Sequence, residues 1–186
     1  MKKQIIFSLL FLVTTSFFAQ DIYLHCGKLI DTNSGKILNE MTIVVSENKI
    51  VAVKKGFVDS VNSADILIDL KQKTVLPGLI DMHVHLESEM KPSAYIEKYT
   101  SNEADIAFNA VKYAEATLLA GFTTVRDLGG SGVNVSLRNA INKGKIVGPR
   151  IFTSEKSLAT TGGHADPTDG ASRKLMGNPG PKEGVV

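Results

Sequence analysis

The sequence predicts an α/β protein in which a small β unit precedes the start of a parallel α/β unit. Residues 21–76 contain short β-prone runs separated by turns, without helical spacing of apolar residues. From Pro77 onward, apolar strands alternate with segments of helical periodicity, which is typical of a parallel sheet. The composition, 43% hydrophobic and 22% charged, fits a soluble globular protein, and the net charge of +2 argues against a nucleic-acid partner. We therefore expect two domains, residues 21–76 and residues 77–186.

The first twenty residues have the pattern of a secretory signal peptide. Lys2 and Lys3 precede an apolar run from Ile5 to Val13, and small and polar residues follow up to Gln20. The apolar run is shorter than the roughly 20 residues that span a bilayer. We expect residues 1–20 to be removed and the protein to be exported, periplasmic or secreted, without stable membrane insertion. The alternative is a buried amino-terminal helix.

Residues 21–76 are expected to form a small antiparallel β unit. Strands are predicted at Ile22–Cys26, Met41–Ser46, Ile50–Val53 and Asp65–Leu70, with a turn at Asp31–Gly35. Cys26 is the only cysteine, so the chain cannot form an intrachain disulfide. We expect Cys26 to be a small buried residue of the first strand.

The second unit is predicted to begin strand, helix, strand, helix, strand. The predicted strands are residues 79–86, 122–128 and 150–154, and the helices are residues 103–120 and 133–142. Gly121 has the residue type that commonly follows the last turn of a helix. The segment from Gly162 onward is rich in Gly, Pro, Asp and Asn and is expected to be a long loop.

A pair of histidines closes the first strand of this unit. His83 and His85 occupy alternate positions, so their side chains leave the same face of the strand, with Cα atoms about 6–7 Å apart. Two imidazoles at this spacing can bind one metal ion. Asp81 lies on the same face and could orient His83 through the second nitrogen of its ring. The carboxyl end of a parallel strand is where α/β barrels place their chemistry.

Several segments together resemble the amidohydrolase superfamily, and within it the group of imidazolonepropionase and Xaa-Pro dipeptidase. They are Pro77–His85, Gly121–Asp127, Gly148–Ile151 and Thr161–His164, with Lys28–Asp31 resembling the family's entry into its β-sandwich. The resemblance implies an incomplete TIM-type (β/α)8 barrel, limited to its first three strands and preceded by a small β-sandwich subdomain.

The resemblance also implies roles for three histidines. His83 and His85 match the family's pair of metal ligands at the end of the first barrel strand, and His164 matches a histidine that binds substrate. The cofactor is then a divalent metal, with zinc expected, as one or two ions. Members of the family complete the site with a carboxylated lysine, two more histidines and an aspartate from later strands.

The function expected from this resemblance is metal-dependent hydrolysis of a carbon–nitrogen bond in an amide or a dipeptide, as in Xaa-Pro dipeptidase. The alternatives are a cyclic-amide hydrolase of the imidazolonepropionase type and a non-catalytic, exported, β-rich interaction module. The expected partner is a small-molecule or dipeptide substrate. The sequence is also compatible with a homo-oligomer.

Residues 77–186 are less than half of the about 250 residues of a complete barrel. We therefore expect an amino-terminal fragment that is inactive alone and holds metal weakly.

For five polar residues near the strand ends, a structural role is expected in preference to a contact with substrate. Arg126 and Asp127 could form an ion pair or contact substrate. Glu87 is expected on the loop surface, and Asp166 and Asp169 are expected to be solvated turn residues.

Overall fold

The computed structural model describes residues 20–186, so the predicted signal peptide over residues 1–20 lies outside the described residues except for Gln20. The chain divides into two compact units, and the boundary lies between Pro77 and Gly78. Between residues 20 and 186, none of the helices has the length and apolar character needed to cross a membrane.

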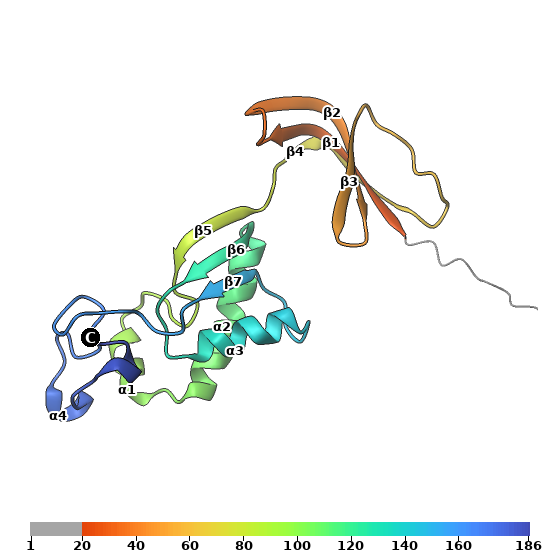
Figure 1. Cartoon of the computed structure of the whole chain (residues 1–186). Coiled ribbons are helices and arrows are strands. Elements are labelled where there is room, and N and C mark those ends of the chain that lie inside the picture. Colours follow the sequence, from red (N-terminus) through yellow and green to blue (C-terminus); the bar gives the residue numbers. More distant parts are fainter. Residues whose placement is uncertain (1–19) are drawn as a thin grey trace, which may run out of the picture. The chain divides into compact units, whose positions relative to one another are not determined.

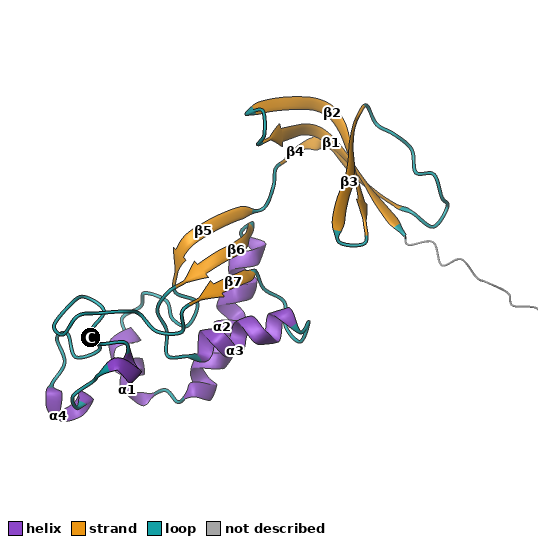
Figure 2. Cartoon of the chain, in the orientation of Figure 1, coloured by secondary structure: helices purple, strands orange, loops and turns teal. Residues whose placement is uncertain are grey.

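The first unit is one sheet of four strands in the order β3-β2-β1-β4 (Figure 2). The strands are β1 (Asp21–Asp31), β2 (Lys36–Ser46), β3 (Lys49–Lys55) and β4 (Ile66–Val75). All four predicted strands are present, and tight turns join β1 to β2 and β2 to β3.

The predicted antiparallel arrangement is wrong for β4. β1 pairs antiparallel with β2, for example Tyr23 with Val44, but β4 pairs parallel with β1, for example Ile66 with Ile22. Parallel neighbours need a long connection, and β2, β3 and the loop of residues 56–65 provide it. A sandwich needs a second sheet, whereas the described strands of this unit form a single sheet, so the expected sandwich is not seen in them.

One face of this sheet carries the apolar core of the unit. Cys26, Leu29, Met41 and Ile43 form a buried cluster in which Cys26 is fully buried and not in a disulfide. The predicted buried position of Cys26 is therefore confirmed. Burial raises the pKa of its thiol because the charged thiolate loses solvation.

The second unit contains a three-stranded parallel sheet in the order β5-β6-β7, with helices α2 and α3 on one face (Figure 1). The bounds are β5 (Leu79–Val84), α1 (Ala94–Thr100), α2 (Glu103–Leu119), β6 (Phe122–Asp127), α3 (Val133–Asn142) and β7 (Arg150–Thr153). The predicted α/β order is confirmed, and α1 is an additional short helix.

The core of the second unit lies between the sheet and its two long helices. Val125 of β6 and Ile151 of β7 pack against Ala110 and Ala114 of α2 and Leu137 of α3, and all five are buried. Because side chains alternate along a strand, Arg126 and Phe152 lie on the opposite face. That face has no helix against it among the described residues, and 58% of Phe152 is exposed.

The helix ends follow the expected local rules. The side chains of Asn102 and Asp105 form a capping box at the start of α2. Gly121 follows the last turn of α2 with a φ of 99°, a left-handed conformation that a side chain would strain. This positive φ explains why glycine stands between α2 and β6.

The end of the chain is more ordered than the predicted long loop. A short helix α4 (Arg173–Met176) and a 3-10 turn η1 (Pro181–Glu183) interrupt it. Near the end of the chain, Val185 lies beside Ala159, and the two residues form an isolated parallel bridge.

Candidate metal centre

The two histidines predicted as metal ligands lie side by side at the carboxyl end of β5. The centroids of the His83 and His85 rings are 5.3 Å apart, and the ring planes are inclined by 59°. Two imidazoles on one tetrahedral ion, with metal–nitrogen distances of about 2.0–2.1 Å, have centroids roughly 5 Å apart. Both side chains are exposed. The pair therefore has the spacing that a shared ion requires.

A backbone carbonyl orients the ring of His85. Nδ1 of His85 lies 3.3 Å from the carbonyl oxygen of Gly129, in the loop after β6. A carbonyl oxygen only accepts, so this contact is a hydrogen bond when Nδ1 carries the proton. In the neutral ring, Nε2 then keeps its lone pair and is the nitrogen available to a metal.

Asp81 does not orient His83 in the predicted way. Its Oδ1 accepts a hydrogen bond of 3.0 Å from the backbone N–H of His83, rather than from the ring. The short side chain of an aspartate easily reaches the backbone N–H two residues later in the chain. Asp81 therefore fixes the backbone at the strand end, and the His83 ring is not held by it.

Asp127, at the end of β6, is fully buried. Its Oδ2 accepts the N–H of Leu86 at 3.0 Å, and its Oδ1 accepts the N–H of Gly129 at 3.2 Å. The predicted ion pair with Arg126 is absent from the described residues, because neighbours in a strand point to opposite faces. Arg126 Nε instead donates to the carbonyl of Met82 at 2.6 Å.

Glu87 caps α3 and is not a free surface residue. Its two carboxylate oxygens accept the backbone N–H groups of Ser131 and Asn134, both at 2.6 Å. Helix α3 has no side-chain cap of its own at Gly132, and a carboxylate is favourable at a helix amino terminus. A Cβ at Gly130 would lie 2.5 Å from Glu87 Oε1, so a side chain there would displace the Glu87 carboxylate. This capping joins the loop after β5 to the loop after β6.

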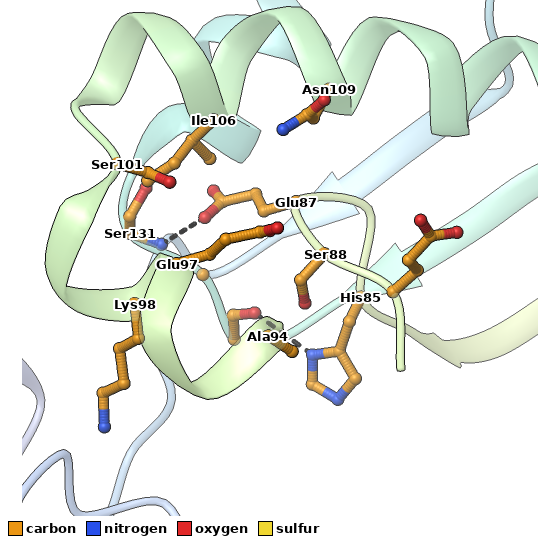
Figure 3. Close-up of a pocket in the computed structure, with 13 residues that line it drawn as sticks. His85, Glu87, Ser88, Ala94, Glu97, Lys98, Ser101, Ile106, Asn109 and Ser131 are labelled. Carbon is orange, nitrogen blue, oxygen red and sulfur yellow. Dashed lines mark hydrogen bonds between the residues drawn. The ribbon is translucent and has the colours of Figure 1, made fainter. Parts of the chain in front are cut away.

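A cavity of about 310 Å³ opens beside His85 (Figure 3). Its walls come from the loop after β5, from α1, from the start of α2 and from Gly129–Ser131. Glu97 of α1 borders it and is paired with Lys91 at 2.9 Å. The hydrogen bond from Lys91, followed by that from Ser93, lowers the pKa of Glu97. The cavity therefore adjoins His85, one of the two candidate ligands. Of its acidic side chains, Glu97 is paired with Lys91, and Glu87 binds the amides at the start of α3.

The sequence of the second unit matches a known protein family. The model of the amidohydrolase family matches residues 74–182, which is more than half of the chain. The chain belongs to the amidohydrolase family. The match contains the whole β5–α2–β6–α3–β7 segment and both histidines of the pair.

Solved structures and curated relatives agree with this assignment. A Xaa-Pro dipeptidase crystallised with methionine in its active site is 46% identical, with a TM-score of 0.82, over 90% of this chain and 41% of that chain. A prolidase in complex with N-methylphosphonate-L-proline is 36% identical, with a TM-score of 0.68, over 78% and 34% of the two chains. Ochratoxinase of Aspergillus niger is 32% identical over 154 residues, 77% of this chain and 30% of its own length. The amidohydrolase chain thus spans less than half the length of these proteins.

The residues present fit part of a metal site. The amidohydrolase family generally uses divalent metals, and the His83–His85 geometry suits one ion. Among residues 20–186, no group of three or more His, Cys, Asp or Glu side chains could hold an ion. Catalytic zinc usually has three protein ligands, so the two histidines supply an incomplete set. His25 is buried in the first unit, with Nε2 2.9 Å from the Val58 carbonyl.

His164 lies on the loop after β7 and is exposed. It is not among the residues that line the cavity beside His85. The neighbouring Asp166 differs from the expectation of a solvated residue, because only 4% of it is exposed. Asp166 accepts hydrogen bonds from the N–H of Gly162 at 2.7 Å and from the N–H and hydroxyl of Thr168 at 2.8 and 2.7 Å. Asp169 is exposed, as predicted.

The loop that carries His164 is expected to loosen in acid. The N–H of Gly162, then the hydroxyl and N–H of Thr168, lower the pKa of Asp166 below its ordinary value of 3.8. A lowered pKa means that the folded loop favours the ionised carboxylate, so this stabilisation is full above 3.8 and is lost as the pH falls through the lowered pKa.

Hydrogen-exchange protection of the Gly162 and Thr168 amides should therefore fall at acid pH. Asp166→Asn should show reduced protection at every pH, with little further change in acid. Protection in the wild type that is constant across this range would contradict the role of Asp166.

Proposed function

We propose that this chain is the amino-terminal part of a metal-dependent hydrolase that cleaves carbon–nitrogen bonds, with Xaa-Pro dipeptides as its substrates. The single observation behind this proposal is the His83–His85 pair, with ring centroids 5.3 Å apart at the carboxyl end of a parallel strand. In α/β barrels, residues at that end of the strands carry the chemistry.

In this proposal His83 and His85 hold a divalent ion, zinc in the first instance. When bound, such an ion acts as a Lewis acid that makes hydroxide available near neutral pH and polarises a carbonyl. His85 binds through Nε2, because its Nδ1 faces the Gly129 carbonyl oxygen at 3.3 Å. The cavity beside His85 gives a substrate group access to the same position. His164 is proposed to contact substrate rather than metal.

The choice of a dipeptide over other amides rests on relative similarity. Among the solved structures, the identity of 46% to a Xaa-Pro dipeptidase exceeds the 27% to ochratoxinase. The basic and apolar start of the sequence supports export as a further part of the proposal. An exported dipeptidase would act on peptides outside the cytoplasm.

The decisive experiment uses the protein expressed from the whole reading frame that encodes this sequence. Release of proline from a panel of Xaa-Pro dipeptides is measured with and without a metal chelator, and N-acyl amides serve as the comparison substrates. We expect hydrolysis of the dipeptides, its loss with chelator and its recovery with added Zn²⁺. Activity that survives complete metal removal would contradict the metal-dependent mechanism.

The chain of residues 1–186 alone should be inactive in the same assay. It contributes two of the three or more protein ligands that a catalytic zinc site needs. We expect no proline release above background and weak Zn²⁺ binding by calorimetry. Chelator-sensitive peptidase activity of this chain would overturn the expectation.

A further inference from the structure

The buried carboxylate of Asp127 touches the two backbone segments that define the position of His85. Leu86, whose N–H donates to Asp127 Oδ2 at 3.0 Å, directly follows His85 in the chain. Gly129, whose N–H donates to Asp127 Oδ1 at 3.2 Å, carries the carbonyl oxygen that lies 3.3 Å from His85 Nδ1. One side chain therefore fixes both the backbone of the ligand and the backbone of its hydrogen-bond acceptor.

The acceptor carbonyl is held from its other side as well. The next amide, that of Gly130, donates to the carbonyl of Glu155 at 3.0 Å, in the loop after β7. The carbonyl oxygen of Glu155 also accepts a hydrogen bond from Asn134 Nδ2 at 2.9 Å. A peptide group that donates through its N–H becomes a stronger acceptor at its oxygen. The Gly129 carbonyl is thus both immobilised and polarised toward His85.

The contacts of Asp127 suit positioning better than charge pairing. Neither of the two ion pairs formed between residues 20 and 186 involves Asp127. Its three donors are the neutral N–H groups of Leu86 and Gly129 and, at 3.4 Å, the amide of Asn134. An unpaired charge is costly to bury, and the N–H groups around Asp127 offset this cost by donating to both of its oxygens. A carboxylate is distinctive in accepting from two N–H groups at once with both of its oxygens.

We propose that Asp127 is a positioning residue that holds His85 in the form protonated on Nδ1, with Nε2 directed to the metal. The tautomer is a property of the metal-free protein. The consequence for metal affinity rests on the proposed function, since it requires that His85 is a ligand.

The test compares the wild type with Asp127→Asn in the protein expressed from the whole reading frame. Asn keeps the shape of Asp, but its amide group is a donor and cannot accept the second N–H, so one of the two backbone amides loses its partner. Asp166→Asn is the matched control, because Asp166 is also buried and also accepts two backbone amides, but in a different loop.

The first measurement is the tautomer of His85, by NMR of the metal-free protein with ¹³C-labelled histidine rings at a pH well above the ordinary histidine pKa of about 6.5. The His85→Gln variant assigns the signal. We expect the Nδ1–H form in the wild type and in Asp166→Asn, and a mixture of both forms in Asp127→Asn. A wild-type ring protonated on Nε2 overturns the proposal, even where Asp127→Asn fails to fold.

The second measurement is Zn²⁺ affinity by competition with a chromophoric chelator. We expect binding to weaken about 10–100-fold in Asp127→Asn, as for other groups that orient metal-binding histidines, and to stay unchanged in Asp166→Asn. Equal affinity of a folded Asp127→Asn and the wild type refutes the positioning role. Absence of Zn²⁺ binding by the wild type refutes the proposed function instead, and the tautomer then still decides the role of Asp127.

Discussion

Replacing either His83 or His85 by alanine is expected to remove both bound metal and hydrolase activity from the protein expressed from the whole reading frame. In the proposed site each ring supplies one of a small number of ligands, and the two rings are close enough to share one ion. Residues that only orient a ligand contribute about 10–100-fold to metal affinity, so loss of a ligand itself should cost at least about 100-fold. Metal content after gel filtration and a Zn²⁺ competition titration measure the effect.

The fold should survive these two substitutions. Both histidines are exposed, and substitutions at exposed positions usually change the free energy of unfolding by less than about 0.5 kcal/mol. Far-UV circular dichroism and the thermal midpoint of the metal-free protein check this.

His164→Ala is the matched control for metal binding, because His164 is also an exposed histidine of the second unit but lies on the loop after β7. It should keep its metal and change KM more than kcat. Unchanged metal content in both His83→Ala and His85→Ala would remove the basis of the proposed function.

Features that depend on local sequence were predictable. The expected helix over Val133–Asn142 coincides with α3, and β6 and β7 each differ from the expected strand by one residue at the end. Apolar periodicity and glycines at turns set these bounds, and both are read within a window of a few residues. The His83–His85 geometry was predictable for the same reason, since two residues of one strand suffice to define it.

Features that depend on distant partners were not predictable. Glu87 binds the amides of Ser131 and Asn134, which are 44 and 47 positions away, and Asp127 binds the amide of Leu86, which is 41 positions away. Nothing in the neighbourhood of Glu87 or Asp127 in sequence indicates these partners. The parallel pairing of β4 with β1 is of the same kind. A useful signal for Glu87 was the missing cap of α3, because a helix end without its own acceptor needs one from elsewhere.

The largest expected loss of stability comes from Asn134→Asp in α3. Asn134 is fully buried, and its Nδ2 donates to Asp127 Oδ1 at 3.4 Å and to the Glu155 carbonyl at 2.9 Å. Aspartate would replace this donor by an acceptor and place a second carboxylate against Asp127. Leaving a buried hydrogen-bonding group without its partner costs about 1–3 kcal/mol, and more when the group is charged. A urea titration followed by the amide signals of α3 measures the change.

The dipole of α3 opposes this loss, so its magnitude decides whether Asn134→Asp lowers or raises the stability of the protein. Asn134 lies in the first turn of α3, where a negative charge interacts favourably with the helix dipole by about 0.3–1 kcal/mol. Glu87 already occupies that amino terminus, so a further acid gains less and is repelled by two carboxylates. We therefore expect net destabilisation of several kcal/mol.

Asn139→Asp, an exposed position on the same helix, is the matched control and should change the free energy of unfolding by less than about 1 kcal/mol. Equal stability of Asn134→Asp and Asn139→Asp would mean that the hydrogen bonds that Asn134 donates to Asp127 and to the Glu155 carbonyl contribute little to the stability of the folded protein.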